Sequence, residues 1–388
     1  MARNSNIDAL RGLAIVAVVE HHLLSRTGAY ATLGVPQVIC DLLDFGWAGV
    51  DLFFVLSAYL LTANLLRYRD QPGVAAAFYK RRALRILPLY WSLIVSGFAL
   101  HAAWRASGGT DDLALWFNAY PLWVYLAFLQ NWVAGLDIAW VAYFYAPTWS
   151  LAVEEHFYLI LPALVLWLAP RRLASVAAGA ILTAPLIRAG LDTLVNSNAS
   201  YAWSIARIDA FGWGVLLALA PRLWPRLSVN VRATRVGAAA LLLAIVLACV
   251  PPLIGLPDVR HASNAIALTL TALIAAGAAF AAITLRPTAV PGHLMGAMVW
   301  CGERCFSLYL WHMPVLGLVF LAVGAMQPQA HTLDGVILAL LAGVLTFVLS
   351  GLTYRVIEQP FMALADRHAC YVAHAATPRP VAPGLAAS

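Results

Sequence analysis

Apolar runs long enough to cross a bilayer recur along almost the whole chain. A helix needs about 20 predominantly apolar residues to span the hydrocarbon core. The pattern therefore predicts an all-α, polytopic membrane protein with about ten transmembrane helices. The ten stretches lie near residues 9–25, 45–66, 84–104, 150–169, 173–190, 203–220, 235–252, 265–284, 304–324 and 334–356.

A further apolar stretch, residues 113–133, has a different character. It is rich in Trp and Tyr and is broken by Asn118 and Pro121. Aromatic residues of this kind favour the membrane boundary. We therefore expect an interfacial or re-entrant segment here rather than another span.

The distribution of Lys and Arg favours ten spans over eleven. With ten, the loops of one side hold little beyond Arg26, Arg105 and Arg260, and the other side holds most of the basic residues. Cytoplasmic loops carry an excess of Lys and Arg, so we expect both termini in the cytoplasm and the protein in the inner (plasma) membrane. The basic side comprises Arg67, Arg69, Lys80, Arg81, Arg82, Arg85, Arg171, Arg172, Arg222, Arg226, Arg232, Arg235, Arg286, Arg304, Arg355, Arg367 and Arg379.

Composition supports the membrane assignment. Of 388 residues, 62% are apolar and 11% charged, whereas a soluble domain has about 25% charged residues. The net charge of +6 is not gathered on a soluble basic module, which nucleic-acid binding would need. We expect one transmembrane domain over residues 1–360 and a cytoplasmic, disordered tail over 361–388, rich in Ala and Pro toward its end.

The first apolar stretch, residues 8–22, keeps several ionisable side chains in a membrane helix. Such groups are costly at membrane depth and usually mark a pathway or a reaction site. Arg11 and His22 are separated by roughly 16 Å along a helix. Because Glu20, His21 and His22 interrupt the apolar run, we expect the segment to be retained as helix one rather than cleaved as a signal peptide.

His22 is the candidate general base. Three consecutive residues point about 100° apart on a helix, so Glu20, His21 and His22 do not all face inward. His22 lies in line with Arg11, and a neutral imidazole can take a proton from a hydroxyl near neutral pH. The alternative is a buried histidine that merely hydrogen-bonds between helices.

Arg82 and Arg85 are the candidate phosphate ligands. They are three residues apart, on one helix face, where the third span leaves the basic side. Paired guanidinium groups suit bidentate phosphate recognition. For the neighbouring Lys80 and Arg81, ordinary anchoring at the membrane surface is the simpler interpretation.

A second polar cluster opens the fourth span. Trp149 and Ser150 precede Glu154, Glu155 and His156, which continue into an apolar helix. A helix N-cap with acids in the first turn is the plain explanation. One of the carboxylates could instead orient His22 or hold a sugar hydroxyl.

Three further polar positions are weaker candidates. Asp51 is a lone acid at the start of span two, where helix capping is the alternative. His312 lies mid-span before Pro314, where a packed core histidine is equally plausible. The stretch 354–360, with Glu358, is most simply a charged helix terminus.

The five cysteines show no disulfide framework. Cys301 and Cys305 share a helix face, but further Cys or His ligands are missing around them. We interpret them as structural thiols and expect no metal site.

Six stretches, in this order, resemble the acyltransferase-3 family of integral-membrane O-acyltransferases, the group that includes O-antigen and exopolysaccharide acetylases. The resemblance runs from Asp8 to Pro360. It rests on IDALRGLAIVAVVEHH, GVDLFFVLSAYLL, FYKRRALRILPLYW, PTWSLAVEEHFYLILP, LYLWHMP and YRVIEQP. The chain departs from the usual family pattern at Ala58 (commonly Gly), at His156 (commonly Gln) and at Glu20.

The resemblance implies a ten-helix domain that passes an acyl group, usually acetyl, from cytoplasmic acyl-CoA to a hydroxyl of a cell-envelope or exported glycan. Three family patterns fall on pairs of residues here: Arg11 with His22, Arg82 with Arg85, and Glu154 with Glu155.

The residue-based interpretation and the resemblance lead to one functional hypothesis. Acyl-CoA binds at the arginines on the inner side, the acceptor enters from the outer side, and His22 deprotonates the acceptor hydroxyl for direct attack on the thioester. This hypothesis predicts a tunnel lined by spans one to four. The expected roles are catalytic for His22, Glu154 and Glu155, donor-binding for Arg82, Arg85 and Arg11, and acceptor-binding for Asp51, Trp149, Ser150, His156 and His312.

Two other functions remain compatible with the sequence. A transporter of an anionic metabolite or glycan would use the same arginines but would not need a basic His22. A purely structural membrane partner would leave Glu20, His22 and Glu154 without a reason to lie in the membrane. The sequence leaves the acceptor and the oligomeric state open, with a homodimer as one possibility.

Overall fold

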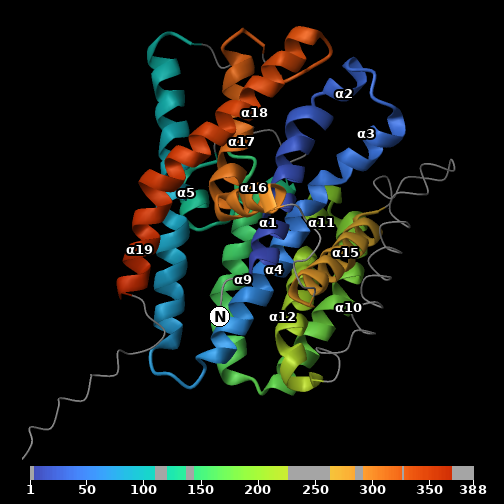
Figure 1. Ribbon diagram of the computed structural model, residues 1–388, viewed down its shortest axis with the longest axis vertical. Coiled ribbons are helices and arrows are strands. Elements are labelled where there is room, and N and C mark those ends of the chain that lie inside the picture. The colour runs from blue at the N-terminus through green and yellow to red at the C-terminus, as the bar shows by residue number, and fades with distance from the viewer. Residues whose placement is uncertain are drawn as a thin grey trace, which may run out of the picture.

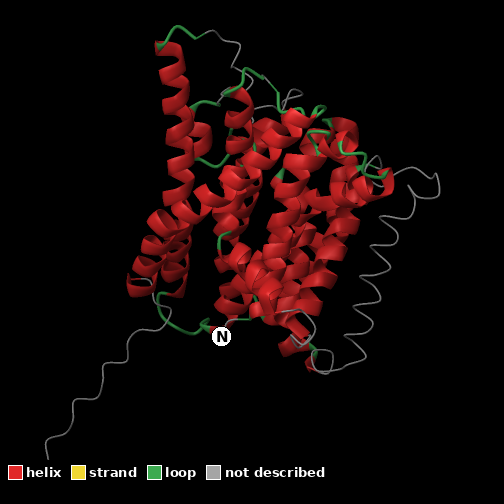
Figure 2. Ribbon diagram, turned by 45° about the horizontal axis from the view of Figure 1, so that its top comes forward, coloured by secondary structure: helices red, strands yellow, loops and turns green. Residues whose placement is uncertain are grey.

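The computed structural model describes residues 4–109, 120–136, 144–225, 263–284, 292–325 and 327–368. Every regular element in these ranges is a helix (Figure 2). Seven of the helices are long and apolar enough to cross a membrane, and a bent pair adds an eighth. The all-α, polytopic membrane fold is thus confirmed.

The count of ten spans stays a prediction. The predicted span 235–252 lies outside the described residues. The first predicted span, 9–25, does form a continuous helix from Ser5 to Ser25. It carries three charged side chains, at Asp8, Arg11 and Glu20, which sets it apart from the more apolar helices.

Helix α1 (Ser5–Glu20) lies at the centre of the molecule (Figure 1) and continues as a π-helical turn, η1 (His21–Ser25). Ile15 and Val18 are completely buried. Helix α1 packs against α4 (Gly49–Arg67), α15 (Asn264–Thr284), α16 (Gly292–Glu303) and α17 (Cys305–Leu321).

Glycines let α1 and α16 approach backbone to backbone. A Cβ atom on Gly12 would meet the carbonyl group of Met298, and one on Gly302 would meet the carbonyl oxygen of Asp8. Small residues permit this kind of close packing between membrane helices. Helices α16 and α17 bend by 75° at the break between Glu303 and Cys305, so the start of α17 faces α1 near Arg11.

A second group of helices packs beside α4 (Figure 1). The guanidinium group of Arg188 donates to both carboxylate oxygens of Asp209, at 3.0 and 2.7 Å, and both side chains are buried. The pair ties two of these helices together. The group consists of α10 (Pro170–Leu194), the 3-10 turn η4 (Ser204–Arg207) and α12 (Ile208–Leu223), with α15.

Helices from both ends of the chain complete the bundle. The long α5 (Val74–Ala106) packs against α19 (Gln359–His368), which lies beside it in Figure 1. Helix α19 follows α18 (Leu333–Thr353) through a second π-helical turn, η6 (Tyr354–Glu358). Outside residues 120–136, the other elements of the described ranges are α2 (Ala29–Thr32), α3 (Gln37–Asp44), η2 (Phe45–Ala48), α9 (Thr148–Trp167) and α11 (Ser197–Ala202).

The interpretation of residues 354–360 as a charged helix terminus is wrong. The helical path continues through η6 into α19, and Glu358 is only 1% exposed. Its carboxylate accepts a hydrogen bond from the Ser307 hydroxyl. A buried polar partner, rather than solvent, holds this carboxylate.

The part of segment 113–133 that the structure describes, from Tyr120 onward, contains no spanning helix. It forms the short helices α7 (Leu122–Leu126) and α8 (Gln130–Leu136). Helix α8 packs against α9 and α11. This agrees with a re-entrant or interfacial segment.

The described N-terminus and the end of α19 lie toward the same end of the molecule (Figure 1). The turn between α4 and α5 lies at that end too. This arrangement fits termini on one side of the membrane, and their cytoplasmic location stays a prediction.

Candidate active site

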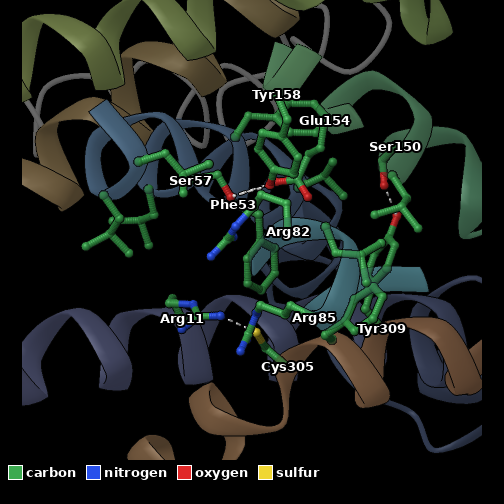
Figure 3. A pocket seen from close by; sticks show the side chains of 18 residues that line it. Arg11, Phe53, Ser57, Arg82, Arg85, Ser150, Glu154, Tyr158, Cys305 and Tyr309 are labelled. Carbon is green, nitrogen blue, oxygen red and sulfur yellow. Dashed lines mark hydrogen bonds between the residues drawn. The ribbon is translucent and has the colours of Figure 1, made fainter. Parts of the chain in front are cut away.

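Three arginines from two helices line one cavity of about 290 Å³. Arg11 comes from α1, and Arg82 and Arg85 come from α5. In Figure 3 the three side chains point into a common space. We call this the arginine cavity. Its other polar lining residues are Ser57, Ser150, Glu154, Tyr158, Cys305 and Tyr309.

Two of the arginines make weak polar contacts with sulfur. Arg11 donates to the Cys305 thiol at 3.0 Å and lies 3.7 Å from the Asp8 carboxylate. Arg85 donates to the Met362 thioether at 2.7 Å. Sulfur is a weak acceptor. A phosphate oxygen would accept a hydrogen bond from a guanidinium group more strongly than these sulfur atoms do.

Glu154 lies beside Arg82 and across the arginine cavity from Arg11 and Arg85 (Figure 3). Its Oε1 atom accepts a hydrogen bond of 2.8 Å from Ser57, and the Tyr158 hydroxyl donates to the Ser57 hydroxyl at 3.2 Å. Arg82 and Arg11 lie close enough to interact electrostatically with the carboxylate. Ser57 and Tyr158 thus fix the orientation of Glu154 toward the arginines.

A second cavity, of about 630 Å³, contains the candidate base. We call it the histidine cavity, because His21, His22 and His312 line it. Aromatic side chains form much of its remaining wall. They are Trp47, Trp149, Tyr201 and Tyr309.

The backbone sets the tautomers of two of these histidines. Nδ1 of His22 lies 2.9 Å from the carbonyl oxygen of Val18, and Nδ1 of His312 lies 2.6 Å from that of Tyr309. A carbonyl only accepts, so each neutral ring carries its hydrogen on Nδ1 and keeps a lone pair on Nε2. The two rings are 5.0 Å apart. Both are therefore prepared to accept a proton.

His21 also lines the histidine cavity, although only His22 was singled out from the sequence. Nδ1 of His21 lies 3.2 Å from the carboxylate of Asp44, which also accepts a 2.6 Å hydrogen bond from Ser25. Glu20 faces elsewhere and accepts a hydrogen bond of 2.5 Å from Tyr30. The wider π-helical turn lets neighbouring histidines reach one cavity.

The two cavities adjoin at Val50 and Tyr309, which line both. The hydroxyl groups of Tyr309 and Ser150 are 2.7 Å apart. Helices α4, α9 and α17 contribute to both cavities, whereas α1 lines the arginine cavity through Arg11 and its continuation η1 lines the histidine cavity through His21 and His22. The predicted lining by spans one to four thus omitted α17, which supplies Cys305, Tyr309 and His312.

Three predicted site residues lie on neither cavity wall. Asp51 is 1% exposed and is paired with Arg207 at 3.2 Å. His156 bonds through Nδ1 to the Ser204 hydroxyl at 2.6 Å. Glu155 has one buried carboxylate oxygen without a hydrogen-bond partner in the described structure. The structure therefore separates these residues from the other candidates.

Several residues of the site were not singled out from the sequence. Ser57, Tyr158 and Tyr309 carry hydroxyl groups within apolar helices. Such side chains are common in helices of this kind, so they did not stand out in the sequence. Arg207 carried a usable signal, because an arginine in an apolar run is expensive unless it is paired. Its guanidinium carbon lies 4.6 Å from the Tyr201 ring centre and 5.4 Å from that of Trp149.

Comparison with known proteins agrees with this geometry. The acyltransferase-3 family model, described as an acyltransferase domain, matches residues 4–355. The peptidoglycan O-acetyltransferase OatA of Listeria monocytogenes is 26% identical over 92% of the chain, and the O-acetyltransferase OatA of Staphylococcus aureus is 25% identical over 91%. The chain spans about half the length of these relatives, 55% and 56%.

A further relative has a more similar length. The putative membrane-bound transacylase BcsY of Komagataeibacter xylinus is 29% identical, over 94% of the chain and 84% of its own length. No solved structure matches the chain. Because the family model covers most of the sequence, the chain belongs to the acyltransferase-3 family.

Proposed function

We propose that the protein is a membrane O-acyltransferase that moves an acyl group, which we take to be acetyl, from cytoplasmic acyl-CoA to a hydroxyl of a cell-envelope or exported glycan. The observation that carries this proposal is the pairing of two adjoining cavities. One is lined by three arginines and the other by two imidazoles with free Nε2 lone pairs.

The arginine cavity suits the donor. Arg82 and Arg85 lie in the inner part of the membrane domain according to the predicted topology, where acyl-CoA is available. The phosphates of coenzyme A are anions, and guanidinium groups bind such oxygens in a bidentate manner. Arg11 lines the same cavity from α1 and would add a third positive charge.

The histidine cavity suits the acceptor. Sugar rings present both apolar faces and hydroxyl groups, and this cavity combines tryptophan and tyrosine side chains with histidines. The curated relatives named as O-acetyltransferases support a hydroxyl acceptor. An acceptor from the cell envelope would approach from the outer side.

His22 would act as the general base. Its Nε2 atom takes the proton of the acceptor hydroxyl while the hydroxyl oxygen attacks the thioester carbon. Direct transfer needs no nucleophilic residue of the protein. Glu154 lies in the arginine cavity, so its proposed contribution is to balance the charge of the arginines and position the donor rather than to contact His22.

The test is release of free CoA thiol from acetyl-CoA by the purified protein in nanodiscs, with and without an envelope-glycan extract. We expect His22→Ala to lower kcat by about 10²- to 10⁴-fold, as loss of a general base does. We expect Arg85→Ala to raise the KM for acetyl-CoA by about tenfold or more, as loss of a charged hydrogen bond does.

Matched controls are available outside both cavities. His293 on α16 is exposed, and Arg81 on α5 pairs with Asp366. His293→Ala and Arg81→Ala should leave turnover within a factor of two of the wild type. Folded wild-type protein that binds no acetyl-CoA would overturn the proposal. Intact ligand binding with full tolerance of His22→Gln would favour a transporter instead.

A further inference from the structure

One polar side chain belongs to both cavities. Val50 and Tyr309 are the residues that line the two, and of these only Tyr309 carries a hydrogen-bonding group, within the part of the chain that the structure describes. A donor in one cavity and an acceptor in the other would bring the thioester carbonyl and the attacking hydroxyl together beside this phenol.

We propose that the Tyr309 hydroxyl is the oxyanion donor of the transfer reaction. This inference rests on the proposed function. As the acceptor oxygen bonds to the thioester carbon, the carbonyl electron pair moves to its oxygen, and the Tyr309 O–H donates to that negative charge. His22 takes the acceptor proton. The intermediate collapses with cleavage of the C–S bond, and the CoA thiolate leaves and recovers a proton from His22.

Helix α17 places the phenol next to the bases. Tyr309 and His312 lie one turn apart, with ring centres 5.6 Å from each other, and the His312 ring is 5.0 Å from that of His22. The three rings form a continuous row that leads from the junction into the histidine cavity. A proton acceptor and a hydrogen-bond donor thus flank the same point, as attack on a carbonyl requires.

The arginines are poorly placed for this role. Arg11, Arg82 and Arg85 line the arginine cavity and are not among the residues of the histidine cavity. They are suited to the phosphates, which lie at the far end of the pantetheine arm from the thioester. Stabilisation of the developing oxyanion therefore falls to a group at the junction.

Ser150 would prepare Tyr309 for donation. The two hydroxyl oxygens are 2.7 Å apart, and either group could donate to the other. If Ser150 donates, the Tyr309 hydrogen is left for the substrate, and a chain of hydrogen bonds strengthens each member. Ser150 is then a positioning residue that acts through Tyr309.

The test compares Tyr309→Phe with the wild type in nanodiscs, in acetyl transfer and in slow acetyl-CoA hydrolysis without acceptor. Both reactions pass through an oxyanion at the same carbon. Removal of one oxyanion donor costs about 10²- to 10³-fold in kcat. We expect that loss in both reactions, with the KM for acetyl-CoA unchanged, and a smaller loss for Ser150→Ala.

Tyr79→Phe is the matched control. Tyr79 lies on an exposed part of α5, outside both cavities, and its hydroxyl donates to the Leu159 carbonyl of α9. Tyr309→Phe with wild-type kcat would overturn the inference while leaving the proposed function intact. Loss of transfer with normal hydrolysis would also overturn it, because the phenol would then serve only the acceptor. A wild-type protein without any acetyl-CoA turnover would overturn the proposed function itself.

Discussion

The carboxylate of Asp51 stabilises the fold and lines neither cavity. It is 1% exposed, receives a 3.2 Å hydrogen bond from Arg207 and accepts a 3.1 Å hydrogen bond from Thr271. Arg207 in turn stacks near Tyr201 and Trp149, which line the histidine cavity. Asp51 therefore holds Arg207 in place, and Arg207 supports the aromatic wall of the histidine cavity.

Substitution of Asp51 by Asn should destabilise the protein strongly. Removal of one partner of a buried ion pair leaves an uncompensated charge and costs about 3–5 kcal/mol. The measurement is thermal or denaturant unfolding in nanodiscs. The double variant Asp51→Leu with Arg207→Met should regain most of the loss, because it removes both charges. Wild-type stability of Asp51→Asn together with a raised KM for the acceptor would instead support a direct substrate contact.

At the scale of elements, the packing of α1 against α16 determines where Arg11 lies. Gly12 follows Arg11 directly, and a Cβ atom on it would collide with the Met298 carbonyl group of α16. Cys305, which accepts the hydrogen bond from Arg11, begins the next helix. A change in the spacing of α1 and α16 would therefore move an arginine of the site.

Gly12→Ala is expected to lower stability by about 1–3 kcal/mol, as overpacking of a tight contact does. It should also raise the KM for acetyl-CoA, because Arg11 shifts with α1. Gly296→Ala, in α16, is the control, since a Cβ atom there meets nothing within 4 Å. Alanine favours helix over glycine, so the control should be neutral or slightly stabilising. Equal unfolding behaviour of the two variants would contradict this account of the contact.

The sequence was informative about elements that obey the usual helical period. Long apolar runs predicted the helices around Asp51 and Glu154 because hydrophobicity alone places a helix in a bilayer. The π-helical turns His21–Ser25 and Tyr354–Glu358 could not be predicted in this way. Each inserts a wider turn that depends on tertiary contacts, and such turns are often found at functional sites.

The sequence identified most of the residues that line the candidate site, but it did not predict that they line two separate cavities. The charged residues Arg11, Arg82, Arg85 and Glu154, which stand out inside apolar runs of the sequence, line one cavity in the fold. The spacing of Arg11 and His22, roughly 16 Å along a helix, indicated that they lie at different depths. It did not indicate two cavities that adjoin at Tyr309, because that junction depends on where α17 packs. Adjacent positions such as Glu154 and Glu155 also point to different surroundings, which depends on helix rotation.

At the scale of the whole molecule, the junction of the two cavities should control transfer without controlling donor binding. Val50 lines both cavities and is 6% exposed. A Phe at this position would narrow the junction and shift the reacting groups apart. A displacement of about 1 Å can cost on the order of 10²-fold in rate. We expect Val50→Phe to reduce the rate of acetyl transfer by that order and to leave the affinity for acetyl-CoA, measured by calorimetry, unchanged.

Val95→Phe, on the exposed face of α5, should leave both the transfer rate and the affinity unchanged. Full activity of Val50→Phe would mean that donor and acceptor meet elsewhere, and Tyr309 would then lose its proposed place in the reaction.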